Sequence, residues 1–401
     1  MNDSGGQSGQ GPSTHSRIAD IEVLRAMAIG MVLLQHVGGI LIPWIPWNGP
    51  PYNWFGFWSG VDLFLVISGF VIGRSLLPML PSASDPRTFF KVSLSFWVRR
   101  VWRLMPTAWL WLAIAMAASV VFNRSNVFGS VESNVRCSVM ALLGLANVHF
   151  AHVFLRIPGG AMVHYWSLAL EEQFYLVLPF LVFLAGRKLP LALILIVAAQ
   201  FFLRRVGPDA SVLLNVTKTD GLALGVLLSI WSQRPGYANL EPRLLKAWPL
   251  RMLLPFAFLL VFAFASRITG NPPRYLVGVL GLMAAAMVWI ASYDGDYILP
   301  PGRLKQMACW MGSRSYGIYV IHLPVYLATH EIWSRLSPAV VAPGRHHMAI
   351  LLATAAALTL LLAELNFRLV ESPLRRRGAQ IAQRMLRREP GRLPEAVQHA
   401  A

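Results

Sequence analysis

Charged residues are scarce in this sequence of 401 residues. Asp, Glu, Lys and Arg together make up 13% of the chain, whereas a soluble domain carries roughly 25%. This scarcity excludes an ordinary soluble protein, because no stretch between the apolar runs is long enough to build a soluble core. Cysteine is also rare. Cys137 and Cys309 stand alone in apolar surroundings, which excludes a disulfide framework and gives no metal-ligand spacing, so no metal is predicted.

Long apolar runs are what the chain has in abundance. Hydrophobic residues account for 56% of it, and runs near the roughly 20 residues that a membrane span requires recur along its length. The sequence therefore predicts an all-α membrane protein, a polytopic helical bundle of about ten transmembrane helices. The predicted spans are 21–42, 54–80, 101–122, 166–185, 189–203, 214–232, 250–267, 273–292, 306–329 and 347–370.

The segment 135–155 is the least regular of the apolar runs. Its apolar part is short, and it contains Arg136, Asn147 and His149. If this segment does not cross the membrane, more Lys and Arg fall on the cytoplasmic side, as the positive-inside rule requires. We therefore predict a re-entrant or peripheral element near 135–155, with both termini in the cytoplasm.

The same topology accounts for the formal net charge of +17. The basic residues lie in short loops beside apolar runs and no nucleic-acid-binding motif is present, so we predict no nucleic-acid partner. Residues 1–16 are rich in Gly, Ser and Gln and are predicted to be a disordered cytoplasmic tail. Residues 17–377 form the predicted membrane domain, and 378–401 a basic cytoplasmic tail in contact with membrane lipids.

The first predicted span carries an arginine and a histidine on one face. Arg25 and His36 are separated by about three helical turns, which places them about 16 Å apart along the helix axis. Taken singly, Arg25 could be a boundary anchor and His36 a histidine bonded to a neighbouring helix. Polar groups within a span are costly in lipid, however, and two on one face indicate a polar channel from the cytoplasm to a buried histidine.

Two further groups of polar residues lie at span boundaries. Asp62 and Ser68 occur in the second span, where an acid needs a partner, and His36 or an arginine are the candidates. Arg99, Arg100 and Arg103 stand at the cytoplasmic start of the third span. Such a cluster is either a topology signal or a receptor for phosphates, since guanidinium groups bind phosphate oxygens in pairs.

The fourth and ninth predicted spans supply the remaining candidates. In the fourth, Glu171 and Tyr175 stand one helical turn apart, preceded by Trp166, and a solvated helix end is the alternative interpretation. In the ninth, several polar residues precede Pro324, so a packed role at a kink is an alternative for the histidine; these residues are Ser315, Tyr316 and His322.

Taken in order, these segments resemble the acyltransferase-3 family of integral membrane acyltransferases. The resemblance covers about residues 17–377 and rests on six motifs in sequence order. They are Arg-x10-His (Arg25, His36), Gly60 to Phe70 with Asp62 and Ser68, Arg99–Arg100–Arg103–Pro106, Trp166 to Tyr175 with Glu171, Ser315–Tyr316–Tyr319–His322, and Glu371–Pro373. Phe64-Leu65 stands where the family often has two phenylalanines.

The resemblance implies an acyltransferase of the bacterial inner membrane. Its donor would be cytoplasmic acyl-CoA, most often acetyl-CoA, and its acceptor a hydroxyl of a cell-surface or secreted carbohydrate or glycolipid. Some relatives carry a fused extracytoplasmic esterase-like domain. This sequence is expected to be the stand-alone form, so any second transfer step would use a separate extracytoplasmic partner.

The residues and the resemblance together suggest a division of labour. The arginines of the third span suit the phosphates of the donor, and His36 could act as a general base, oriented by Asp62 or Glu171, with Arg25 guiding the donor. Ser68, Trp166, Tyr175, Ser315, Tyr316 and His322 would line the channel or contact substrate. The competing hypothesis is a transporter or flippase that moves lipid-linked sugar without chemistry. Release of free coenzyme A distinguishes the two.

Overall fold

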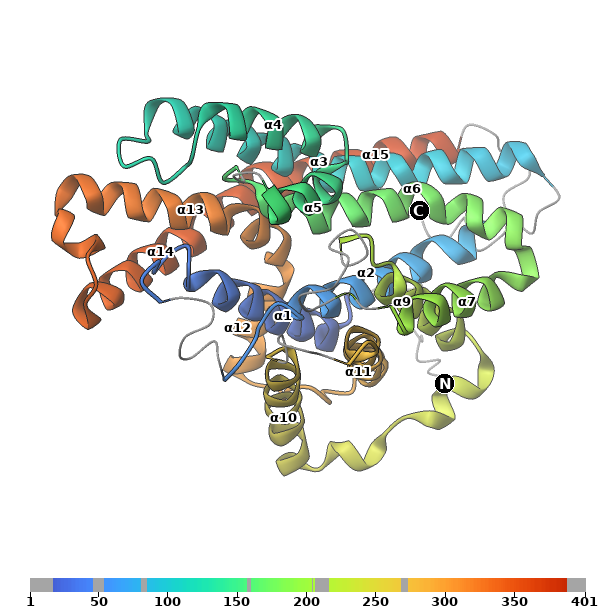
Figure 1. Ribbon diagram of the computed structural model, residues 1–401. Helices are drawn as coiled ribbons and strands as arrows, with labels where there is room; N and C mark the ends of the chain where they lie inside the picture. The colour runs from blue at the N-terminus through green and yellow to red at the C-terminus, as the bar shows by residue number, and fades with distance from the viewer. Residues whose placement is uncertain are drawn as a thin grey trace, which may run out of the picture.

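The computed structural model describes residues 17–45, 54–80, 85–156, 160–203, 205, 216–267 and 273–387, and this part of the chain is built from helices (Figure 1). The predicted segment 1–16 and residues 388–401 of the predicted tail lie outside it. The helices are α1 (Ala19–Val37), α2 (Gly60–Leu76), α3 (Pro86–Val121), α4 (Val131–Leu142), α5 (Ala146–Arg156), α6 (Trp166–Ala185), α7 (Leu189–Phe201), α9 (Asp220–Ser232), α10 (Trp248–Ser266), α11 (Leu276–Ala291), α12 (Arg303–Ser313), α13 (Ser315–Leu336), α14 (Arg345–Asn366) and α15 (Ser372–Arg387).

The lengths and composition of the helices fit an integral membrane protein. Four described stretches are long and apolar enough to cross a membrane: Gly60–Met79, Pro86–Val121, Val163–Phe201 and His346–Leu386. Three shorter apolar helices accompany them, Asp220–Ser232, Pro249–Ala265 and Leu276–Ala291. The part of the chain that the structure describes is therefore all-helical, as expected of a polytopic membrane protein, while the predicted number of about ten spans is not confirmed.

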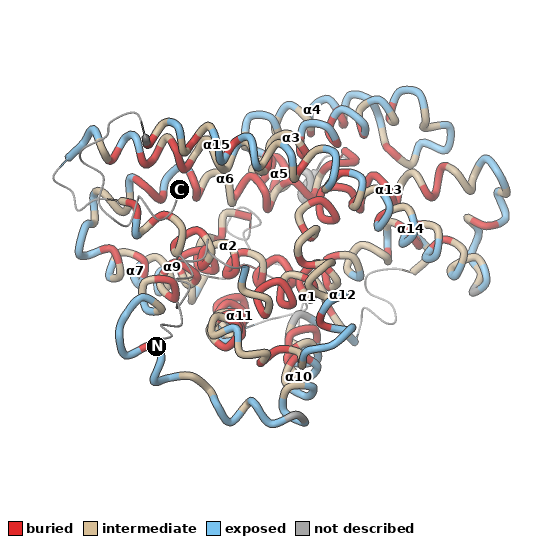
Figure 2. The backbone as a smooth tube through the Cα atoms, turned by 180° about the vertical axis from the view of Figure 1, so that it is seen from behind, coloured by how far each residue is buried: buried red, intermediate tan, exposed pale blue. Residues whose placement is uncertain are grey.

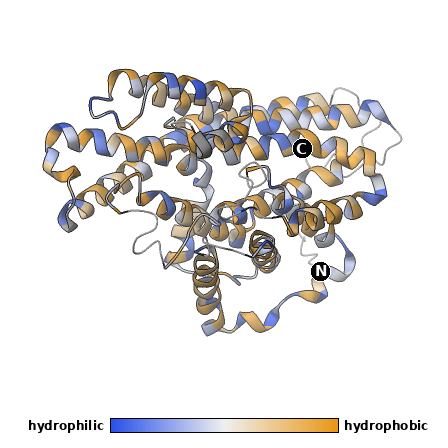
Figure 3. Ribbon diagram, viewed as in Figure 1, coloured by the Kyte–Doolittle hydropathy of each residue, from blue (hydrophilic) through white to orange (hydrophobic). Residues whose placement is uncertain are grey.

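Burial is concentrated in a central group of helices. Figure 2 shows buried residues gathered along α1, α2, α9 and α11, and Figure 3 shows apolar residues continuing over the outer helices. On α7, for example, Leu191 and Leu195 are more than half exposed, whereas Leu193 is fully buried. Apolar side chains on the outer surface as well as in the core are what a lipid environment favours.

The contact between α2 and α9 is the closest in this central group. A Cβ atom added to Gly69 would lie 2.1 Å from the carbonyl oxygen of Leu222, and one added to Gly225 would lie 2.2 Å from that of Val66. Glycines therefore allow the two backbones to touch, as small residues do between membrane helices. This contact fixes α2, which carries Asp62 and Ser68, against the rest of the core.

The predicted span 306–329 is wrong as a single element. The structure divides it into α12 and α13, which meet at Arg314. α12 packs against α1, and Gly312 sits so close to the carbonyl of Glu22 that a Cβ would be 1.9 Å from its oxygen. The side chain of Arg314, at the junction, pairs with Glu364 of α14 at 2.6 Å. The polar residues Ser313 to Ser315 mark the junction in the sequence, between apolar residues on either side.

The region predicted as re-entrant forms two short helices. α4 and α5 are joined by a tight turn in which Gly144 has a φ of 67°. With 12 and 11 residues, each is shorter than the roughly 20 residues of a span. α4 packs on α3 and α5 on α6. Their depth in the membrane stays a prediction.

The last described helix, α15, packs along α3 (Figures 1 and 2). Gly378 lies against Trp102, and Arg377 stacks on the same ring at 5.7 Å. The domain boundary predicted between residues 377 and 378 falls inside this helix. Ala382 and Leu386 are buried, so the first part of the predicted tail packs on the protein.

Candidate active site

A cleft lined by arginines opens where the ends of several helices meet. Its walls come from the start of α1, the end of α2, the middle of α3 and the start of α15. We call it the arginine cleft, and Glu22 is the one carboxylate among its lining residues. Its arginines are Arg17, Arg25, Arg74, Arg103 and Arg375. Sequence reasoning had singled out Arg25 and Arg103 but missed the other three, because each looked like an ordinary charge at the end of a span.

A second cavity continues from the arginine cleft into the protein. The two share Arg25, Val71, Arg103 and Ser313 among their lining residues, so they adjoin, and we call the two together the passage. We call this second part the inner cavity. Its polar lining includes residues predicted for the site, namely Ser68, Arg100, Glu171, Tyr175, Ser315 and Tyr316. Ser167, Tyr319 and Glu371 line it as well.

One wall of the inner cavity is a hydrogen-bonded group centred on Glu171. The carboxylate accepts from the hydroxyls of Ser68 and Tyr175, and these two hydroxyls are themselves 2.5 Å apart. Arg100 lies over the ring of Tyr175 at 5.6 Å and donates to Ser75 at 3.2 Å. The structure therefore brings together residues that the sequence placed in three separate spans.

The opposite wall is formed by α13 and the end of α14. Tyr316 donates to the carbonyl of Leu104 at 2.5 Å, and Ser315 is buried beside it. Glu371 lies at the end of a π-helical turn, Phe367–Glu371, a local distortion frequent at functional sites. The Oε2 atom of Glu371 is buried and has no hydrogen-bond partner among the described residues. A polar ligand in the cavity would supply one.

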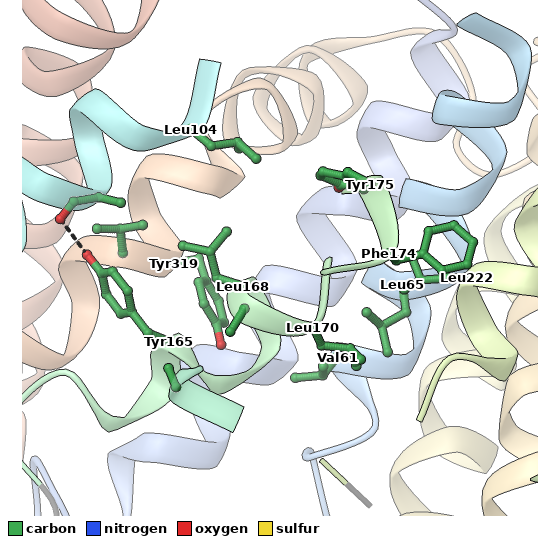
Figure 4. Close-up of a cluster of buried hydrophobic side chains, with 14 of the residues drawn as sticks. Val61, Leu65, Leu104, Tyr165, Leu168, Leu170, Phe174, Tyr175, Leu222 and Tyr319 are labelled. Atoms are coloured by element: carbon green, nitrogen blue, oxygen red, sulfur yellow. Dashed lines mark hydrogen bonds between the residues drawn. The ribbon is translucent and has the colours of Figure 1, made fainter. Parts of the chain in front are cut away.

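The apolar part of the inner cavity is shown in Figure 4. Val61, Leu104, Leu168 and Tyr175 belong both to its lining and to the buried cluster drawn there. Tyr165, behind this layer, donates to the carbonyl of Ala108 at 2.9 Å, the dashed line in the figure. Polar groups on two walls and apolar groups between them suit an elongated ligand of mixed polarity.

Tyr319 lines the inner cavity but not the arginine cleft. Its hydroxyl donates to the carbonyl of His164 at 2.6 Å and lies 2.6 Å from the hydroxyl of Ser167. Because the hydroxyl of Tyr319 donates its only proton to this carbonyl, the hydroxyl of Ser167 must be the donor in the bond between Ser167 and Tyr319. The passage lined by Arg25 thus reaches Tyr319, and His36 is not among the residues that line it.

His36 belongs to a cluster of three histidines, two of which, His164 and His322, lie next to Tyr319. The rings of His36 and His322 are 5.0 Å apart between centroids, and those of His164 and His322 are 5.1 Å apart. Nε2 of His322 is 3.1 Å from Nδ1 of His36. His164 and His322 are buried, whereas His36 in the last turn of α1 is partly exposed. Sequence reasoning missed His164, whose only signal was its place just before the Trp166 segment.

Asp62 does not meet either partner suggested for it. Its carboxylate pairs with Lys218 at 2.8 Å, and both side chains are almost fully buried. Lys218 lies between the rings of Trp58 and Trp166, at 5.5 and 5.9 Å, and Trp166 stacks on Phe150. The proposed orienting role of Asp62 for His36 therefore has no contact to support it, and neither Asp62 nor Trp166 lines the passage.

The three arginines predicted at the start of the third span also differ in whether they line the passage. Arg100 and Arg103 line the inner cavity, and Arg103 also lines the arginine cleft. Arg99 lines neither of them. Its guanidinium lies 3.4 Å from the sulfur of Met79. Helix geometry explains the separation, because adjacent residues on a helix point about 100° apart.

The chain is similar to known proteins over most of its length. Residues 18–364 match the family profile described as an acyltransferase domain. The chain is 29% identical over 392 residues to peptidoglycan O-acetyltransferase OatA of Listeria monocytogenes, covering 90% of this chain and 56% of that protein. It is 27% identical to putative peptidoglycan O-acetyltransferase YrhL of Bacillus subtilis, covering 91% and 56%.

A third similar protein is O-acetyltransferase OatA of Staphylococcus aureus, 24% identical with coverage of 89% of this chain and 57% of that protein. The chain thus spans a little more than half the length of these curated relatives. No solved structure matches this chain.

Proposed function

Because this chain belongs to the acyltransferase-3 family and is therefore an enzyme that transfers acyl groups, we propose that it moves an acetyl group from cytoplasmic acetyl-CoA to a hydroxyl of a cell-envelope carbohydrate. The observation that carries the proposal is the passage from the arginine cleft through the inner cavity to Tyr319. The names of the relatives favour O-acetylation and make peptidoglycan the first acceptor to test.

The arginine cleft supports a phosphorylated donor. Across the cleft and the inner cavity, six arginines face three carboxylates: Arg17, Arg25, Arg74, Arg100, Arg103 and Arg375 against Glu22, Glu171 and Glu371. Coenzyme A carries its phosphates at one end and its acyl thioester at the end of a long arm. The excess of guanidinium groups suits the phosphates, and the narrower cavity beyond them suits the arm.

Transfer itself is assigned to the end of the passage. In the proposed step His36 removes the proton of the acceptor hydroxyl, and the oxygen attacks the thioester carbonyl carbon. The carbon–sulfur bond breaks, the ester forms, and the proton passes from His36 to the departing thiolate, so the products are the O-acetyl carbohydrate and free coenzyme A. Arg25 guides or neutralises the donor. His36 is connected to the passage through Tyr319 and His322, whose rings lie 5.7 Å apart.

The orientation follows from the same assignment. A cytoplasmic donor requires the arginine cleft to face the cytoplasm, which places the start of α1 and α15 on that side of the bacterial inner membrane, with both termini cytoplasmic. A reporter active only in the cytoplasm should be active when fused after Arg387. Activity of a periplasmic reporter at that position would contradict this topology.

The function is tested with the purified full chain in lipid nanodiscs, acetyl-CoA and peptidoglycan fragments. Free coenzyme A should appear in proportion to acetylated acceptor, and His36→Ala should reduce turnover about 10²–10⁴-fold, the range for a missing acid–base group. The same variant should still bind acetyl-CoA. Carbohydrate transport without thiol release would support the transporter hypothesis, and near-normal turnover of His36→Ala would remove His36 from the chemistry.

A further inference from the structure

The histidine cluster raises a question that the proposed function leaves open: which nitrogen of His36 is the base, and what holds it in that form. A histidine can take a proton at a ring nitrogen only if that nitrogen is unprotonated beforehand, and the partner of the other nitrogen decides this. In serine hydrolases an aspartate has this orienting role. Neither acid predicted for it is available here, since Asp62 pairs with Lys218 and Glu171 accepts from Ser68 and Tyr175.

The proton positions in the cluster can be derived from its carbonyl contacts. Nδ1 of His322 lies 2.6 Å from the carbonyl oxygen of Tyr319. A carbonyl oxygen only accepts, so this nitrogen carries the proton. In a neutral ring the other nitrogen, Nε2, then holds a lone pair. His164 is fixed in the same manner, because its Nε2 lies 3.2 Å from the carbonyl of Val320.

The lone pair on His322 determines the state of His36. Nδ1 of His36 faces two acceptors, the carbonyl oxygen of Val32 at 2.9 Å and Nε2 of His322 at 3.1 Å. If Nδ1 of His36 were unprotonated, its lone pair would face the lone pairs of both acceptors, which repel it. Nδ1 of His36 therefore carries the proton and donates it, and Nε2 is the nitrogen left unprotonated. Among the described residues none hydrogen-bonds to Nε2 of His36.

We propose that His322 is a positioning residue, which accepts the Nδ1 proton of His36 and so keeps Nε2 of His36 free to act as the base. This proposal rests on the proposed function of His36. When Nε2 takes the acceptor's proton, His36 becomes a cation, and the lone pair of His322 stabilises the added charge through the same hydrogen bond. The chain of bonds from the backbone carbonyl of Tyr319 through His322 to His36 has the role that an aspartate has in a catalytic triad.

The packing of His322 is consistent with a fixed ring. It is fully buried, with His164 edge-on to it on one side and Tyr326 edge-on at 5.8 Å on another. Tyr326 in turn donates to the carbonyl of Leu33 on α1, the helix of His36. The ring therefore has little room to turn over and exchange its two nitrogens.

The first test reads the proton position directly in the wild-type protein. ¹⁵N-histidine labelling of the full chain in nanodiscs, with the His36 signals assigned by their loss in His36→Ala, should show a protonated Nδ1 and an unprotonated Nε2 at neutral pH. His322→Leu leaves only the carbonyl of Val32 to accept from Nδ1 of His36, and part of the His36 population should convert to the other tautomer. An unprotonated Nδ1 in the wild type would overturn the proposal, whatever the activity of the variants.

The second test compares three substitutions of His322. Glutamine places an amide oxygen near the position of Nε2 and keeps an acceptor for His36, whereas asparagine reaches only the position of Nδ1 and leucine has no acceptor. We expect His322→Gln to retain kcat within about tenfold and the other two to lose about 10²-fold or more, with the KM for acetyl-CoA unchanged in all three. Equal kcat in the Gln and Asn variants would contradict an acceptor at Nε2.

The two proposals can fail separately. If His36→Ala retains turnover while the wild type shows the expected tautomer, the general-base function fails and the His322 contact stands. If His36→Ala is inactive but His322→Leu keeps the wild-type tautomer and kcat, the base stands and the positioning role fails. His322→Leu could lower the yield of folded protein. The Asn variant, which preserves a polar group at the buried site, is the control for this effect.

Discussion

Two groups of charges in this molecule differ in how they are compensated. In the paired group, each cation has its own carboxylate: Lys218 with Asp62 at 2.8 Å, Arg205 with Asp220 at 2.8 and 2.7 Å, and Lys305 with Asp20 and Asp296 at 2.5 and 2.6 Å. In the cleft group, six arginines lie near three carboxylates. The paired charges hold neighbouring segments together, such as α12 and α1 through Lys305 and Asp20, whereas the cleft charges surround a passage.

The difference indicates what each group is for. Burying a charge is costly, so a buried cation normally has a matched anion beside it. If one partner is removed, the other remains buried as an uncompensated charge. A surplus of guanidinium groups beside a cavity is instead satisfied by water or by an anionic ligand. The position of a charge within a membrane span therefore does not tell whether it is paired one to one or belongs to a surplus around a cavity. The partners of the charge do tell this.

The largest effect is expected from breaking the pair of Arg205 and Asp220, both almost fully buried. Asp220→Ala should lower the free energy of unfolding by about 3–5 kcal/mol, because the guanidinium is left buried without its carboxylate. The double variant Arg205→Met with Asp220→Leu should recover most of that loss. Thermal unfolding followed by size-exclusion chromatography measures both. A single variant as stable as the wild type would show that the pair is not a structural contact.

A smaller effect, and on another property, is expected in the cleft. Arg103 lines both parts of the passage. Arg103→Ala should weaken acetyl-CoA binding by about 1.5–3 kcal/mol, or roughly 10–150-fold, through the loss of a charge-assisted bond to phosphate. Its unfolding temperature should change little. Isothermal titration with acetyl-CoA and with dephospho-CoA, which lacks one phosphate, measures the effect; equal affinities for wild type and variant would contradict a phosphate site.

The contrast also explains what the sequence could and could not predict. Arg25, Ser68, Arg100, Arg103, Glu171, Tyr175, Ser315 and Tyr316 were predicted from motifs and all line one passage. Motifs locate residues along the chain but do not reveal which side chains meet. For this reason His36 or an arginine was predicted as the partner of Asp62, although its partner is Lys218, more than 150 positions away.

Elements were predictable where hydrophobic patterns were long, and their boundaries were not. α3 continues for 36 residues, well beyond the predicted span 101–122, because its first half packs on α15. The break at Arg314 and the cleft residues Arg17 and Arg375 depend on tertiary contacts. These contacts bring both ends of the described chain to one cleft, which no local pattern encodes.

Raising the ionic strength should weaken the interactions of the cleft charges more than those of the paired charges. The expected effect is smaller than that of the substitutions above. Raising sodium chloride from about 0.05 M to about 0.5 M shortens the Debye length and screens solvent-accessible charges far more than buried ones. We expect acetyl-CoA affinity to fall several-fold, while the unfolding temperature of the ligand-free protein stays nearly constant. Potassium chloride at the same strengths is the control for a specific ion effect. An affinity independent of salt would mean that the donor is not held by the cleft arginines.

The smallest effect is expected from Arg99, the neighbour of Arg100 on α3. Both belong to the arginine cluster that the sequence assigned to the donor, but Arg99 contacts Met79 and lines neither part of the passage. Arg99→Ala should therefore change acetyl-CoA affinity by no more than about 0.5 kcal/mol, the usual range for a substitution away from a site. Arg103→Ala is its matched partner, since the two substitutions remove the same group one helical turn apart. Measured side by side in the same nanodiscs, a loss for Arg103→Ala alone would place the phosphates in the passage. Equal losses for both would mean that the cluster acts through its total charge, and the distinction between cleft and paired charges would not extend to the donor.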